Sequence, residues 1–181
     1  RSSDLVSKYF ARGLHIGFQE ILPKFSLIHL VRDPISNMCS FLNRNKNFYL
    51  DNNSPYAEGN FLRLGPDLME SSDLYLWAWC EMALRYENMK KSEFVDKYIE
   101  IHTSRLNDSD YMNQCFNTLD LGHDTIKENN IRLNTNVDSG YKKTEVTKYD
   151  VEKFEKFIDK VPKSVIATIP YLQTYNPHSI Y

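Results

Sequence analysis

The stretch from Ser26 to Asn45, SLIHLVRDPISNMCSFLNRN, restricts the fold of this chain more than any other. Its first six residues, SLIHLV, form an apolar run of the length expected for a buried strand. After Arg32 the apolar residues take the spacing of a helix, i, i+3, i+4 and i+7. They are Ile35, Met38, Cys39 and Leu42. Asp33 suits an N-cap and Pro34 the first helical position. The stretch therefore predicts a buried strand that turns directly into an amphipathic helix.

The rest of the chain continues an alternation of helices and strands. Apolar spacing predicts helices over 14–22, 71–91, 108–122 and 147–161, and a second strand over 97–104. We therefore expect a single α/β domain over residues 1–181, with a parallel sheet flanked by helices. Because two strands do not make a stable parallel sheet alone, we expect further strands upstream of residue 1 or from a partner, which leaves an oligomer open.

The helix ends and the long connection give more local expectations. Asp108 or Ser109 should cap the helix over 108–122, with Gly122 just beyond its end. Thr147 and Asp150 give a capping-box pattern. Residues 46–70 form a connection longer than usual, which favours a functional or mobile loop. Its aromatic residues could line an acceptor site or pack on the core: Phe48, Tyr49, Tyr56 and Phe61.

Composition excludes several classes of partner. The formal net charge is −2, so any anion site must be local, and we expect no nucleic-acid partner. No apolar run reaches the ~20 residues of a membrane span. The three cysteines have no spacing typical of a disulfide framework or a zinc site, which indicates a reducing compartment. We expect no metal cofactor.

The polar residues around the Arg-Asp-Pro turn predict an anion site. Ligands of open α/β sheets bind beyond the carboxyl ends of the strands, where Arg32 is expected. The helix N-terminus should add backbone donors and a partial positive charge. A polar stripe follows along the helix: Ser36, Ser40, Asn43 and Asn47. Arg32 and Ser40 could bind one anion, although Arg32 could also be solvated or paired with a carboxylate, and Ser40 a surface hydroxyl.

This arrangement, with eight positions from Arg32 to Ser40, resembles the 3′-phosphate-binding motif of sulfotransferases. These enzymes use 3′-phosphoadenosine 5′-phosphosulfate (PAPS). Four further stretches are similar to the same family: HIGFQEILPKF before the strand, LYLWAW on the long helix, YIEIHTSRLNDSDYMNQCFNTLDLG, and RLNTNVDSGYKKTEVTKYDVEKF, which resembles the basic loop before the last helices. The resemblance covers about residues 12–160 and implies a P-loop-NTPase-like architecture. No Walker A pattern is present, which disfavours a nucleotide kinase.

The resemblance also implies roles for individual residues. Arg32 and Ser40 would bind the nucleotide 3′-phosphate. Lys142 and Lys143 lie in a loop that could close over the phosphates, or could be a solvated basic loop. His15 would be the general base that accepts the acceptor's proton, or an ordinary helix residue. The acceptor class stays open between carbohydrates, protein tyrosines, lipids and small alcohols.

The other histidines and the tryptophans are expected to be structural. His29 lies inside the first strand and should be a packed, hydrogen-bonded core residue. His102 has no supporting context in the sequence. Trp77 and Trp79 lie on the buried helix, where core packing is the expected role and adenine stacking the alternative.

Two departures from the family bear on the function. The family's Gly/Ser/Thr-rich loop for the 5′-phosphosulfate has no counterpart, and HTS stands where the family has a Tyr-Glu-Asp-type stretch. We therefore expect the C-terminal part of a PAPS-dependent sulfotransferase, incomplete at its N-terminus. The alternatives are a non-catalytic nucleotide-binding remnant and another α/β phosphate-binding transferase. The expected location is the cytoplasm, or the Golgi lumen if an upstream anchor exists.

Overall fold

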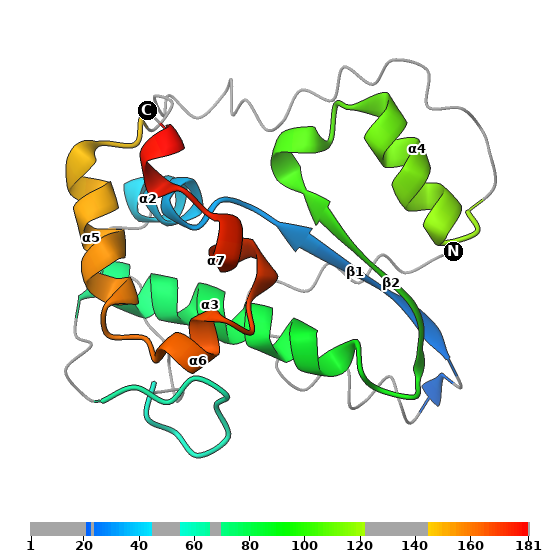
Figure 1. Cartoon of the computed structure of the whole chain (residues 1–181), viewed down its shortest axis with the longest axis horizontal. Coiled ribbons are helices and arrows are strands. Elements are labelled where there is room, and N and C mark those ends of the chain that lie inside the picture. The colour runs from blue at the N-terminus through cyan, green and yellow to red at the C-terminus, as the bar shows by residue number, and fades with distance from the viewer. Residues whose placement is uncertain (1–20, 23, 45–54, 66–69, 122–144, 181) are drawn as a thin grey trace.

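The computed structural model describes residues 21–22, 24–44, 55–65, 70–121 and 145–180. The two strands are parallel and alternate with helices, which confirms the α/β class (Figure 1). The elements are, in order, β1 (Phe25–Val31), α2 (Pro34–Arg44), α3 (Ser71–Met89), β2 (Val95–His102), the 3₁₀ turn η1 (Thr103–Arg105), α4 (Ser109–Thr118), α5 (Lys148–Ile158), α6 (Lys163–Ile166), α7 (Pro170–Thr174) and the 3₁₀ turn η2 (Pro177–Ile180).

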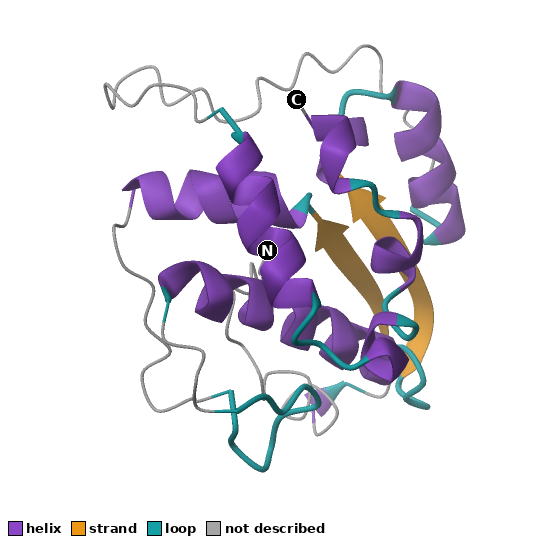
Figure 2. Cartoon of the chain, turned by 60° about the vertical axis from the view of Figure 1, so that its left-hand side comes forward, coloured by secondary structure: helices purple, strands orange, loops and turns teal. Residues whose placement is uncertain are grey.

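The register of the two strands aligns their carboxyl ends. Ile28 pairs with Ile99, and Val31 pairs with His102, the last residue of β2. Arg32 therefore leaves β1 directly beside the end of β2. Figure 2 shows α4 on one side of the two strands and α3 on the other. The predicted strand–turn–helix unit is confirmed, since α2 begins at Pro34 immediately after the Arg-Asp-Pro turn.

The prediction that β1 is a buried strand is wrong for one of its faces. Ile28 is 49% exposed and Leu30 57% exposed, whereas their partners Ile99 and Ile101 are buried. The reason is the position of α4, which packs over β2. Its residues form a small core with the two β2 isoleucines: Met112, Cys115 and Leu119. Among the described residues, no element covers β1 in the same way.

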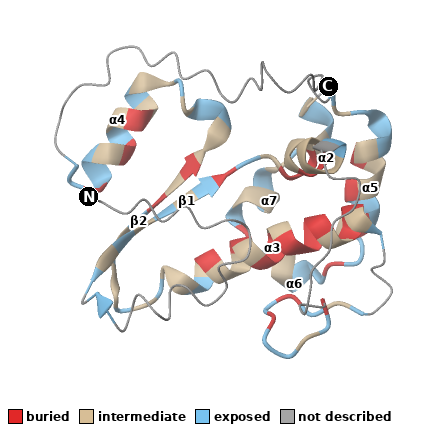
Figure 3. Cartoon of the chain, turned by 180° about the vertical axis from the view of Figure 1, so that it is seen from behind, coloured by how far each residue is buried: buried red, intermediate tan, exposed pale blue. Residues whose placement is uncertain are grey.

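The main core lies away from the sheet, between α2, α3 and α5. The predicted deep burial of the long helix is confirmed, and buried positions follow α3 along most of its length (Figure 3). Trp77 at its centre and Phe157 of α5 are completely buried, as is Ile35 of α2. Burying side chains of this size stabilises the fold by about 1.5–3 kcal/mol each. This core fixes α2, and with it the turn that carries Arg32.

The helix caps follow the sequence signals. Asp108 caps α4, because its carboxylate accepts the backbone N–H of Tyr111 at 2.9 Å. Thr147 and Asp150 form the predicted capping box of α5. The end of α4 differs from the prediction: the helix stops at Thr118, and Asp120 takes a left-handed conformation with φ 54°. Gly122 lies outside the described residues.

A buried carboxylate attaches the described part of the long loop to α3. Glu81 is 1% exposed, and its two oxygens accept the backbone N–H groups of Leu62 at 2.8 Å and Phe61 at 3.3 Å. The Arg85 guanidinium donates to the same carboxylate at 2.6 Å and to the Gly59 carbonyl at 2.8 Å. A buried charge is tolerated when it is paired and hydrogen-bonded in this way. Residues 59–62 are thereby held against the core.

Glu81→Ala should destabilise the protein by about 3 kcal/mol, because it leaves the Arg85 charge without its carboxylate and two backbone donors without an acceptor. Urea unfolding followed by circular dichroism would measure the change. Glu152→Ala is the control, since the Glu152 side chain is 46% exposed and lies 4.0 Å from Lys148. It should change the stability by less than about 0.5 kcal/mol. An equal loss of unfolding free energy in the two variants would contradict this role of Glu81.

Candidate functional site

The candidate site lies at the carboxyl ends of the two strands. Arg32 is exposed there, and among the described residues its guanidinium has no hydrogen-bond or ion-pair partner. Ser40 is half-buried on α2, one turn beyond Ser36. The alternative in which Arg32 pairs with a carboxylate therefore finds no support within the described chain. An exposed, unpaired guanidinium at this edge fits an oxyanion such as phosphate.

Asp33 organises the turn between β1 and α2. One oxygen of its carboxylate accepts the Ser36 backbone N–H at 2.6 Å, which confirms the predicted N-cap. The other oxygen accepts a hydrogen bond from the Tyr175 hydroxyl, near the C-terminus of the chain. The Asp33 carbonyl accepts the backbone N–H of Asn37 at 2.9 Å. Asp33 thus ties the first turn of α2 to the segment after α7.

The first turn of α2 differs from the expectation in one respect. The helix N-terminus was expected to offer free backbone donors, but Ser36 and Asn37 donate to Asp33, and Pro34 has no N–H. Asp33 therefore occupies donors that an anion would otherwise use. An anion at this edge would depend on side chains such as that of Arg32.

Burial, reinforced by the hydrogen bond to Asp33, raises the pKa of the Tyr175 phenol far above its ordinary value. Tyr175 therefore stays protonated at any physiological pH and remains a hydrogen-bond donor. Its ring packs edge-on against Phe154 of α5 and near Tyr171 of α7. Burial also raises the pKa of Tyr171 to about 12.

Trp79 contributes to the edge in a way that the sequence did not indicate. Its indole N–H donates to the Arg32 backbone carbonyl at 3.1 Å, and its ring lies 5.6 Å from that of Tyr171. Trp77 packs in the core, as predicted. Trp79 is half-buried against the same core, as predicted, and also fixes the backbone of Arg32 from α3. In the sequence, the one signal is that Trp79 lies two positions after Trp77. Residues at that spacing in a helix point in different directions.

His102 is the second residue that sequence reasoning missed. It ends β2, and its Nε2 lies 3.1 Å from the Glu100 carboxylate. The other Glu100 oxygen lies 3.3 Å from Nδ1 of His29, whose ring stacks on Tyr86. His29 is thus a packed, hydrogen-bonded residue, as predicted. An i, i+2 spacing on a strand places Glu100 and His102 on one face, a signal available from EIH once the strand is assigned.

The described residues test only part of the predicted site. Arg32 and Ser40 lie on the same turn-and-helix unit, but no direct contact joins their side chains, so their joint role stays a prediction. His15, Lys142 and Lys143 lie outside the described residues, as do Phe48 and Tyr49. Tyr56 and Phe61 are more than half exposed. Within the described ranges there is no group of three or more His, Cys, Asp or Glu placed to hold a metal.

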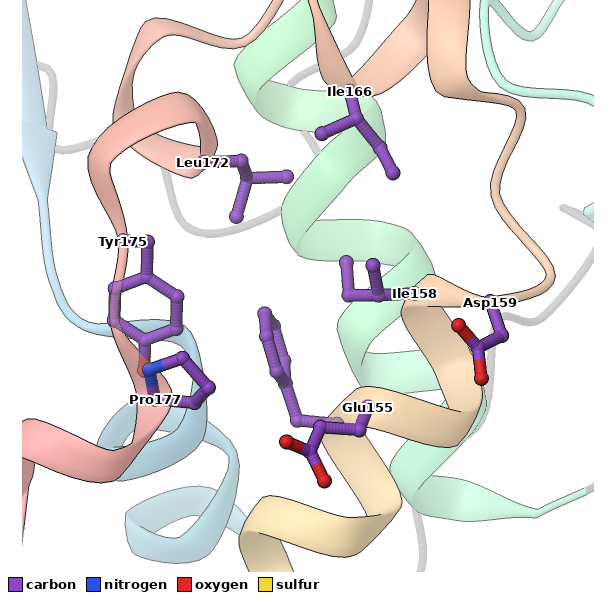
Figure 4. Close-up of a pocket in the computed structure, with 8 residues that line it drawn as sticks. Glu155, Ile158, Asp159, Ile166, Leu172, Tyr175 and Pro177 are labelled. Carbon is purple, nitrogen blue, oxygen red and sulfur yellow. The ribbon is translucent and has the colours of Figure 1, made fainter.

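A separate pocket lies behind Tyr175, between α5, α6 and the C-terminal segment (Figure 4). It is an open hollow of about 210 Å³ with mainly apolar walls, lined by Phe154, Glu155, Ile158, Asp159, Ile166, Leu172, Tyr175 and Pro177. Arg32 and Ser40 are not among these residues. The pocket and the strand-end site share one side chain, Tyr175.

Comparison of the chain with known proteins found no matching family model, no matching curated protein and no matching solved structure. In the described part of the chain, no helix is both long and apolar enough to cross a bilayer.

Tyr175→Phe should lower the free energy of unfolding by about 1–3 kcal/mol, because it leaves one Asp33 oxygen without its donor. Hydrogen exchange should also become faster at the Ser36 and Asn37 amides, which depend on Asp33. Urea unfolding and NMR-detected exchange would measure the two effects. Tyr149→Phe is the control, since Tyr149 is 61% exposed on α5. Unchanged exchange at Ser36 would contradict a role for Tyr175 in ordering the turn.

Glu100 should make stability depend on pH in the acid range. The hydrogen bond from His29 lowers the pKa of Glu100, burial opposes this, and the charges of both histidines lower it further. As the pH falls, the carboxyl therefore binds a proton in the unfolded chain before it does so in the folded protein. The ionised Glu100 stabilises the fold above about pH 4.3, and this stabilisation is lost as the pH drops through the folded-state pKa. The stability difference between wild type and Glu100→Gln should therefore shrink from about pH 6 to about pH 3.

Urea midpoints at a series of pH values would measure this difference. Glu152→Gln serves as the matched control on an exposed carboxylate, and its difference from wild type should stay nearly constant. A Glu100→Gln difference that does not change with pH would contradict the ion-paired state of Glu100.

Proposed function

We propose that this chain forms part of a PAPS-dependent sulfotransferase and holds the 3′-phosphate of the nucleotide. The observation that supports this most is the unpaired, exposed guanidinium of Arg32 at the carboxyl end of a parallel strand. Its backbone is fixed by Trp79, and the following turn by Asp33 and Tyr175. A cation on a backbone held in this way, and left without a protein partner in the described chain, is suited to binding an external anion.

Ser40 is the second proposed ligand. It lies on α2 one turn beyond Ser36, half-buried, with no hydrogen-bond partner among the described residues. A hydroxyl at this position would add a neutral donor to the charged contact from Arg32. Lys142 and Lys143 are proposed to approach the phosphates from their loop, and His15 to act near the acceptor. The roles proposed for these three residues depend on the family resemblance alone.

The chemistry proposed for the full site is in-line transfer. The oxygen or nitrogen of the acceptor attacks the sulfur of PAPS, and negative charge develops on the bridging oxygen of the leaving adenosine 3′,5′-bisphosphate. The residues described here would contribute by positioning the nucleotide rather than by chemical participation. A positioning role suits a site whose clearest element is an exposed cation on a held backbone.

Arg32→Ala should weaken the binding of adenosine 3′,5′-bisphosphate by roughly 10- to 100-fold, because hydrogen bonds to charged groups contribute about 1.5–3 kcal/mol. Ser40→Ala should have a smaller effect, about threefold to tenfold. Isothermal titration calorimetry would measure both. Arg63→Ala and Ser164→Ala are the matched controls, since both residues are exposed and lie on other elements. Neither control should change the affinity.

The same titration distinguishes the alternatives. A nucleotide-binding remnant without activity would bind adenosine 3′,5′-bisphosphate but would not turn over PAPS. Another phosphate-binding transferase would bind ATP or adenosine 5′-monophosphate at least as tightly. The sulfotransferase proposal requires preference for the 3′-phosphate, and undiminished affinity in Arg32→Ala would overturn the assignment of Arg32.

A further inference from the structure

The strand-end site contains a histidine–carboxylate pair whose chemistry goes beyond nucleotide binding. His102 is the last residue of β2 and pairs in register with Val31, so it lies beside the backbone that leads into Arg32. Its side chain is 38% exposed, compared with 22% for His29. Of these two histidines, His102 is therefore the more accessible to a bound molecule.

Contacts from several elements hold the His102 side chain. Glu100 lies 3.1 Å from its Nε2, and the Tyr171 ring of α7 stacks against it with centroids 5.5 Å apart. The His102 backbone N–H donates to the hydroxyl of Tyr111, which donates in turn to the Glu100 carbonyl at 2.9 Å. The position and the plane of the imidazole are therefore restricted on two sides, which is what a catalytic side chain requires.

The electrostatics suit a proton acceptor. The hydrogen bond from His29 keeps the pKa of Glu100 below its ordinary value, so its carboxylate is ionised at neutral pH. An ionised carboxylate at Nε2 makes that nitrogen the N–H donor and leaves the lone pair on Nδ1. It also stabilises the imidazolium that forms when Nδ1 takes a proton. Three phenols with raised pKa values also face this cluster: Tyr86, Tyr111 and Tyr171.

We propose that His102 is a catalytic base that takes the proton of the attacking acceptor, with Glu100 as its positioning residue. This inference rests on the proposed sulfuryl transfer and assigns to His102 the role that the resemblance suggested for His15. A bond forms between the acceptor oxygen and sulfur, and the bond from sulfur to the bridging oxygen breaks. The acceptor's proton moves to Nδ1 of His102, and adenosine 3′,5′-bisphosphate leaves with the bond's electron pair.

The pairing of His102 with Arg32 gives the two strand ends different tasks. Arg32 follows β1 and carries a permanent positive charge, whereas His102 ends β2 and exchanges a proton. The parallel register places Val31, the residue before Arg32, beside His102 on the adjacent strand, about 4.8 Å away at the backbone. In the proposed complex, PAPS would extend from its 3′-phosphate at Arg32 along this edge of the sheet, with its sulfuryl group toward His102.

The first test compares nucleotide binding with turnover of PAPS, with water and 4-nitrophenol as acceptors. His102→Gln should bind adenosine 3′,5′-bisphosphate within about threefold of wild type, but its kcat should fall by about 100-fold or more. Glu100→Gln should lower kcat less, since it removes only the positioning carboxylate. His178→Gln is the control, because His178 is exposed and pairs with Glu155 away from the strand ends. Wild-type turnover in His102→Gln would overturn the proposal.

A second test needs no turnover. Diethyl pyrocarbonate modifies exposed, unprotonated imidazoles, and peptide mass spectrometry would follow His102 and His178 in the same full-length sample. Saturating adenosine 3′,5′-bisphosphate should slow modification of His102 at least fivefold and leave His178 unchanged. Bound nucleotide without protection of His102 would overturn this inference and leave the nucleotide site intact. Absence of nucleotide binding would instead overturn the proposed function, and with it this role for His102.

Discussion

The carboxylate of Asp33 is the contact on which the rest of the site depends. Its two oxygens accept hydrogen bonds from the first turn of α2 and from Tyr175, so one side chain joins the strand end, the helix start and the C-terminal segment. The helix dipole and the Tyr175 hydroxyl both stabilise its negative charge. As a consequence, the charged carboxylate already occupies donors at the helix N-terminus. In the proposed function, recognition of the anion would then depend on side chains rather than on backbone amides.

The long helix α3 connects this site to the rest of the fold. Along its length it buries Trp77 in the core, holds the 59–62 segment through Glu81, and fixes the Arg32 backbone through Trp79. Arg32 can therefore be exposed while its main chain stays tied to a packed helix. The backbone of the strand-end site is thus held both by the core and by the contacts of Asp33.

Local patterns predicted much of this fold, and long-range contacts explain what they missed. Asp33 as an N-cap and Thr147 with Asp150 as a capping box depend on residues within one turn, and all are confirmed. Tyr175 reaches Asp33 across 142 positions, and Trp79 reaches Arg32 across 47. No periodicity encodes such pairs. The apolar run of β1 likewise indicated a strand but not which face is covered, since that depends on where α4 packs.

The uncovered face of β1 has a consequence for handling the protein. Among the described residues β1 pairs along one edge only, and its face presents Ile28 and Leu30 to solvent. A strand with an open edge and apolar side chains is a template for pairing with whichever strand it meets. We therefore expect the solubility of the protein to increase when a lysine replaces Ile28. This change should matter more than a change in the overall net charge, which is already close to zero.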